Sequence, residues 1–164
     1  METIVEQAFR TATPIPVIVL RCAAASLLGL VIGFEREARE RPAGLRTHML
    51  TSLAAALFTL IAAELIAAFG ADDEVTQLDP IRVVEAVTTG VAFIAAGAII
   101  QARGDVRGLT TGAGMWLAGA VGLACGAGFL TIAVIGTGLG IIILFPLRML
   151  EKRYFEEDDD GGSQ

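Results

Sequence analysis

The chain has 164 residues and a formal net charge of −6, and 54% of its residues are hydrophobic before its 19 glycines are counted. A soluble globular domain reaches only about 45–50% with glycine included, so this composition argues against a soluble domain and for membrane spans. The chain also lacks the basic, aromatic-bearing soluble segment with which proteins bind nucleic acids, so no nucleic-acid partner is expected.

The first segment, residues 1–14, has apolar residues at helical spacing, which favours a short interfacial helix before the membrane domain. Three apolar segments follow at residues 15–34, 47–69 and 83–101. A helix of about 20 residues matches the roughly 30 Å of hydrocarbon in a bilayer. These segments therefore predict three transmembrane helices.

The most informative segment is residues 108–147, a run of 40 without a charged residue. As one helix it would be about 60 Å long, twice the hydrocarbon thickness, so the chain must fold back. The glycines Gly126 and Gly128 favour a break there because glycine has a permissive backbone. We therefore predict a fourth span at 109–125 and a fifth at 129–147.

Together these segments predict an all-α integral membrane protein, with a bundle of about five transmembrane helices at 15–150 and an acidic, disordered tail at 151–164. With five spans, nine positive residues share one side of the membrane and only Arg10 and Arg82 lie on the other. Positive residues concentrate on the cytoplasmic side, so we expect the N-terminus outside and the C-terminus in the cytoplasm. The nine residues are Arg36, Arg39, Arg41, Arg46, Arg103, Arg107, Arg148, Lys152 and Arg153.

Three charged residues, Arg21, Glu64 and Glu85, fall inside the predicted spans. A charge in the hydrocarbon costs roughly 2.5–3.5 kcal/mol on insertion scales and often marks function. All three fall in the outer half of the bilayer, so we hypothesise that Arg21 pairs with Glu64 inside the bundle and that Glu85 joins them. The alternative is that each side chain reaches the membrane interface alone.

Small residues at four-residue spacing allow transmembrane helices to approach closely. Such sets occur at Gly29/Gly33, at Ala118/Gly122/Gly126 and at Gly136/Gly140. We interpret them as contacts within one subunit, and a homodimer interface is the alternative.

The connection between the first two spans has an ordered charge pattern. Two acid–base pairs at i,i+4 spacing would extend the first helix beyond the membrane. The pairs are Glu35 with Arg39 and Glu37 with Arg41. Pro42 and Gly44 then favour a turn, and Thr47 can cap the second span.

The connection at residues 103–111 places two arginines, Arg103 and Arg107, and an acid, Asp105, beside Gly108. Either Thr110 or Thr111 can cap the fourth span, and its N-terminus favours an anion. We expect that anion to be a carboxylate of the first connection, Glu35 or Glu37, paired with one of the two arginines. A bound anion such as phosphate is the alternative.

Three ordered segments resemble the MgtC/SapB family of membrane proteins. They read GFEREARERPAGLRTHML from Gly33, DPIRVVEAVTTGVAFIAAGAII from Asp79 and RGDVRGLTTGAGMWLAGAVGLACGAG from Arg103. Ala92 and Ala95 stand where the family usually has Gly, and Ala86 stands where Gln is frequent.

The resemblance implies a multi-pass protein of the bacterial inner membrane that is linked to magnesium limitation and regulates other membrane proteins. Some members have a soluble C-terminal domain, which we do not expect in this chain. The expected partners are the lipid bilayer and another membrane protein. The segments single out an outer-loop motif, Asp79 and Arg82, and a cytoplasmic motif, Glu35, Arg36, Glu37, Arg41, Pro42, Gly44, Leu45, Arg46, Thr47, Arg103, Asp105, Arg107, Gly108, Thr110 and Thr111.

A direct transporter of Mg²⁺ or another small ion is the alternative function. Magnesium prefers oxygen ligands in an octahedral arrangement, and no predicted span carries two acids at i,i+3 or i,i+4. Glu64 and Glu85 could form a weak site, for which Arg21 would compete. The only histidine, His48, is interpreted as an interfacial residue, and the chain has no catalytic motif. We therefore expect no enzyme activity, no catalytic residue, no metal site and no cofactor.

Overall fold

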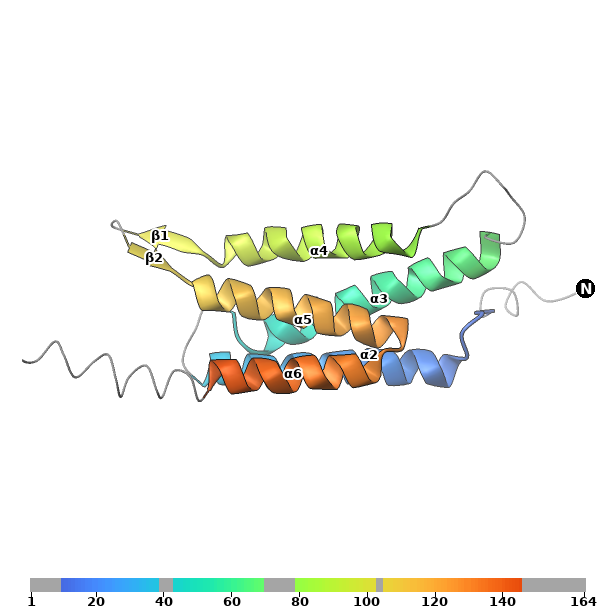
Figure 1. Ribbon diagram of the computed structural model, residues 1–164, viewed down its shortest axis with the longest axis horizontal. Coiled ribbons are helices and arrows are strands. Elements are labelled where there is room, and N and C mark those ends of the chain that lie inside the picture. The colour runs from blue at the N-terminus through green and yellow to red at the C-terminus, as the bar shows by residue number, and fades with distance from the viewer. Residues whose placement is uncertain (1–9, 39–42, 70–78, 103–104, 146–164) are drawn as a thin grey trace, which may run out of the picture.

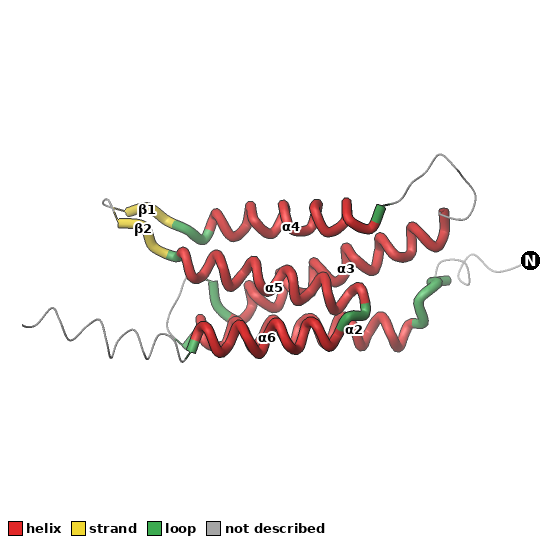
Figure 2. The backbone as a smooth tube through the Cα atoms, viewed as in Figure 1, coloured by secondary structure: helices red, strands yellow, loops and turns green. Residues whose placement is uncertain are grey.

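The computed structural model describes residues 10–38, 43–69, 79–102 and 105–145. Five helices and a small hairpin make up this part of the chain (Figure 1, Figure 2). In chain order they are α2 (Ile15–Glu37), α3 (Leu45–Phe69), α4 (Pro80–Gly97), β1 (Ile100–Ala102), β2 (Asp105–Arg107), α5 (Leu109–Ala127) and α6 (Leu130–Leu144). The acidic tail and most of the predicted interfacial helix lie outside the described residues.

Four of the helices, α2 to α5, are long and apolar enough to cross a membrane, and α6 is a shorter apolar helix of 15 residues. Large apolar side chains face outward, and Phe93 of α4 is 82% exposed. An apolar surface of this kind suits contact with lipid. The backbone N–H and C=O groups form their hydrogen bonds inside the helices, as the absence of water in the hydrocarbon requires. The predicted all-α membrane bundle is confirmed, with five helices among the described residues, four of which are long enough to span a membrane.

Helix α5 lies at the centre of the bundle, where it contacts α2, α3, α4 and α6. Its buried face consists mainly of glycine and alanine. A Cβ built on Gly126 would lie 2.5 Å from the carbonyl oxygen of Ala56 in α3, and one on Gly122 would collide with the backbone of Ser52. Gly29 and Gly33 of α2 pack equally closely on the start of α3. These small residues therefore form contacts within one chain, as we interpreted them.

The predicted fold-back between the last two spans is present. Gly128 follows α5 with a φ of 89°, and the N–H of Phe129 donates to the carbonyl of Ala124 at 2.8 Å. This left-handed turn satisfies carbonyls that the helix end would leave without a partner. The chain then reverses directly into α6.

The helices run alternately up and down, so their connections gather at two ends (Figure 1). The end of α2, the beginning of α3, the β1–β2 hairpin and the end of α6 lie together, and we name this the hairpin end. The beginnings of α2 and α4 and the α5–α6 turn lie at the opposite end. Arg46 and Arg107 therefore share one end of the bundle, and Arg82 lies at the other.

The hairpin was not predicted from the sequence. Strands β1 and β2 pair antiparallel, with Ile100 opposite Arg107 and Ala102 opposite Asp105. The predicted third span at 83–101 therefore ends earlier, because α4 stops at Gly97 and the chain enters β1. Strands of three residues give too little alternation to be recognised in a sequence.

Candidate functional site

At the hairpin end, α2 finishes with a buried ion pair. The side chains of Glu35 and Arg36 are each 3% exposed, and the guanidinium of Arg36 contacts one carboxylate oxygen of Glu35. Removing one partner of such a pair would leave a buried charge, which is strongly destabilising. The expected partner of Glu35 was Arg39, which lies outside the described residues together with Arg41 and Pro42.

The next carboxylate, Glu37, joins α2 to α3. Its Oε2 accepts a hydrogen bond of 3.1 Å from the backbone N–H of Leu45, the first residue of α3. This satisfies one of the N–H groups that a helix start leaves without an internal partner. The prediction that Thr47 caps this helix is wrong. Thr47 lies inside α3, where its carbonyl accepts from the hydroxyl of Thr51 at 2.8 Å.

One turn further along α3, His48 is completely buried. Its Nδ1 lies 2.9 Å from the carbonyl oxygen of Gly44, and because a carbonyl can only accept, Nδ1 must carry the proton. Its Nε2 faces α5, 3.1 Å from the position of a Cβ on Gly114. The interpretation of His48 as an interfacial residue is therefore wrong.

Ser52 lies four residues after His48 and is equally buried. Within the described part of the chain, neither the hydroxyl of Ser52 nor the Nε2 of His48 has a hydrogen-bond partner. Sequence reasoning missed both residues. The available signal was their i,i+4 spacing on α3, which matches the spacing of Gly29 and Gly33 on the facing helix.

The hairpin leads into α5 through a glycine. Gly108 has a φ of 89° and precedes the helix without a capping side chain. The prediction that Thr110 or Thr111 caps α5 is wrong, and Thr111 is buried inside the bundle. Arg107 is exposed at this end, whereas Arg103 lies outside the described residues.

At the opposite end, Arg21 and Glu64 do not form the hypothesised pair. The guanidinium of Arg21 donates to the carbonyl of Gly126, at 2.9 Å, and so holds α2 against the α5–α6 turn. The carboxylate of Glu64 accepts from the backbone N–H groups of Ala12 and Thr13, at 2.6 and 2.9 Å. Both side chains therefore form hydrogen bonds with backbone groups near helix ends. These charge-assisted bonds take the place of the ion pair between Arg21 and Glu64.

The third charged residue of the proposed cluster also lies apart. Glu85 is exposed on α4, and its backbone carbonyl accepts from the hydroxyl of Thr89. Among the described residues, no three His, Cys, Asp or Glu side chains come together where they could hold a metal ion. Within the described residues, the three charges predicted inside the membrane thus form no ion pair with one another.

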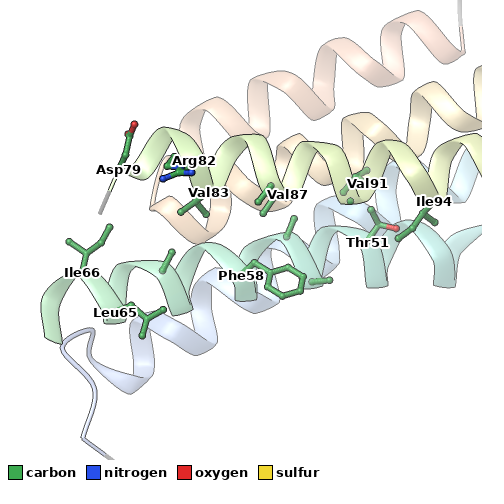
Figure 3. Close-up of a pocket in the computed structure, with 15 residues that line it drawn as sticks. Thr51, Phe58, Leu65, Ile66, Asp79, Arg82, Val83, Val87, Val91 and Ile94 are labelled. Atoms are coloured by element: carbon green, nitrogen blue, oxygen red, sulfur yellow. The ribbon is translucent and has the colours of Figure 1, made fainter. Parts of the chain in front are cut away.

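A groove of about 640 Å³ lies between α3 and α4 (Figure 3). Its walls are apolar over most of their length, and Asp79 and Arg82 lie at the end where α4 begins (Figure 3). The carboxylate of Asp79 accepts from the N–H of Ile81 at 2.9 Å and caps α4. The outer-loop motif thus comprises one helix cap and one exposed arginine at the mouth of an apolar groove.

Known proteins match most of the chain. The MgtC family matches residues 22–153. The Escherichia coli protein named putative magnesium transporter YhiD is 34% identical over 141 residues, which cover 83% of this chain and 65% of that protein. Protein MgtC of Brucella abortus is 39% identical over 128 residues, covering 78% of this chain and 50% of that protein. The chain thus spans between half and two thirds of these relatives. No solved structure matches it.

Proposed function

Because the chain belongs to the MgtC family and is a multi-pass membrane protein, we propose that it regulates other membrane proteins of the bacterial inner membrane when magnesium is limiting. In this proposal it acts by binding a membrane-protein partner and catalyses no reaction. The partner contacts the polar residues at the hairpin end. The alternative partner is a second copy of this chain, which would make a homodimer.

The orientation in the membrane is part of the proposal. The hairpin end faces the cytoplasm, and this is supported by the exposed arginines Arg46 and Arg107 at that end. Positive residues near the ends of spans are retained on the cytoplasmic side. A reporter fused after α6 would then be active in the cytoplasm, and one inserted between α3 and α4 would be active outside.

One observation supports a regulator over a carrier most strongly. The weak ion site considered from the sequence joined Glu64 and Glu85, but the carboxylate of Glu64 accepts from the backbone N–H groups of Ala12 and Thr13. Arg21, the expected competitor for that site, donates to the carbonyl of Gly126 instead. The groove between α3 and α4 is apolar, whereas a hydrated cation needs oxygen ligands along its route. The bundle therefore suits interaction with other molecules better than passage of an ion.

The proposal is tested by capture of membrane partners from native membranes. Replacing Arg46 and Arg107 together by alanine should abolish capture while the protein level stays normal. Arg82→Ala, at the opposite end, is the matched control and should leave capture intact. Equal capture by all three proteins would contradict the proposal, and loss of the protein itself in the double variant would assign these arginines to folding.

Magnesium transport is the second candidate, because the Escherichia coli relative is named a putative magnesium transporter. Purified protein in liposomes that contain a magnesium-sensitive dye separates the two functions. The regulatory proposal expects the same Mg²⁺ entry as in protein-free liposomes. Entry that increases with the amount of protein and disappears in a Glu64→Ala, Glu85→Ala variant that still folds would favour transport.

A further inference from the structure

The groove between α3 and α4 has the dimensions of a single apolar chain. From Ile66 to Thr51 it follows α3 over 16 residues, a rise of about 22 Å. An acyl chain of one leaflet extends about 15 Å, half of the hydrocarbon thickness. The groove is longer than this, so it can hold the full length of one acyl chain.

The interior of the groove is open rather than filled by side chains. Gly90 of α4 lines it, and a Cβ built on Gly90 meets no atom within 4 Å. Most glycines of α5, in contrast, meet a neighbouring helix at close range. An unfilled apolar space forfeits dispersion contacts on both walls, and an acyl chain would restore them.

The end of the groove provides the charge that such a ligand requires. Arg82 is exposed at the mouth (Figure 3), and its side chain forms no ion pair or hydrogen bond with the described residues. The nearby carboxylate of Asp79 already caps α4. Among the described residues that line the groove, Arg82 carries the positive charge, and a guanidinium at the end of an apolar groove complements a phosphodiester attached to an acyl chain.

We infer that the groove between α3 and α4 binds one membrane phospholipid, with an acyl chain along Phe58, Val87 and Gly90 and its phosphate on Arg82. The mouth of the groove at Arg82 lies at the opposite end from Arg46 and Arg107, and neither of those two arginines lines the groove. The groove is therefore independent of the partner surface proposed above, and the two can fail separately.

The experiment is native mass spectrometry of detergent-purified protein after exposure to phosphatidylglycerol vesicles. The wild-type protein should retain one phospholipid per chain. Gly90→Leu should reduce retention by about tenfold or more, because the new side chain occupies the path of several methylene groups. Gly138→Leu is the matched control, since Gly138 on α6 also has open space around a Cβ and lies outside the groove. It should retain lipid like the wild type.

A second variant tests the headgroup. Arg82→Gln should weaken retention of phosphatidylglycerol and leave retention of uncharged diacylglycerol unchanged. If Gly90→Leu and the wild type retain equal lipid, or if a co-purifying membrane peptide fills the groove instead, the inference is overturned. Circular dichroism of both glycine variants ensures that a loss of lipid is not a loss of fold.

Discussion

Glu37, the last residue of α2, accepts a hydrogen bond from the backbone N–H of Leu45, the first residue of α3. One side chain therefore ends one transmembrane helix and begins the next. Gly44 lies between them, and a Cβ there would collide with the carboxylate of Glu37. The contact accordingly depends on a glycine immediately before the helix.

Glu37→Ala should destabilise the protein by about 1 kcal/mol, the usual value of a lost N-terminal cap. The measurement is thermal unfolding in detergent, followed by the fluorescence of the single tryptophan, Trp116. The control is Glu85→Ala, because the carboxylate of Glu85 is exposed and forms no hydrogen bond within the described residues. A lower melting temperature in both variants to the same extent would refute the capping role.

Gly122→Ala should destabilise the bundle by about 1–3 kcal/mol, because the added methyl group meets the backbone of Ser52 and the helices must separate. Gly138→Ala adds the same atom where nothing lies within 4 Å and should be tolerated. The folded fraction after size-exclusion chromatography in detergent compares the two. Comparable folded fractions would show that α3 and α5 are less closely packed than the structure has them.

Arg21→Ala and Glu64→Ala should have independent effects. Each removes a different contact, one to Gly126 and one to the N–H groups of Ala12 and Thr13, so their effects on unfolding should add. A double-mutant cycle in detergent measures the difference between the double variant and the sum. A large coupling free energy between the two substitutions would contradict this prediction and support a direct ion pair between Arg21 and Glu64.

Ser52→Ala should be neutral or stabilising, although Ser52 is completely buried. Its hydroxyl has no partner among the described residues, and burying an unpaired hydroxyl is unfavourable. Thr51→Ala one residue earlier removes a hydroxyl that donates to the carbonyl of Thr47, and it serves as the comparison. Chemical unfolding in detergent measures both variants. A marked loss of stability in Ser52→Ala would indicate a bound water or ion at this hydroxyl.

The number of helices and the fold-back at Gly126 and Gly128 could be predicted because both follow from a length. The bilayer limits how long an apolar segment can run before it must reverse, and an uncharged run of 40 residues exceeds that limit. The closely packed glycines were predictable for a related reason, since small residues at a spacing of four residues leave space for a neighbouring helix.

The individual polar contacts could not be predicted in the same way. Charge attraction suggested that Arg21 pairs with Glu64, but backbone groups at helix ends hold both side chains instead. Which backbone groups are available depends on where each turn is positioned, and this is a tertiary property. The burial of His48 likewise depends on the absence of side chains at Gly29 and Gly114, which lie on two other helices.

The hydrogen bond from Arg21 to Gly126 joins residues 105 positions apart. A ribosome delivers the N-terminal helices first, so α2 enters the bilayer well before the α5–α6 turn exists. During that interval the guanidinium of Arg21 has to draw on water or lipid headgroups for its hydrogen bonds. The contact that holds α2 against the α5–α6 turn can therefore form only after α5 has been inserted.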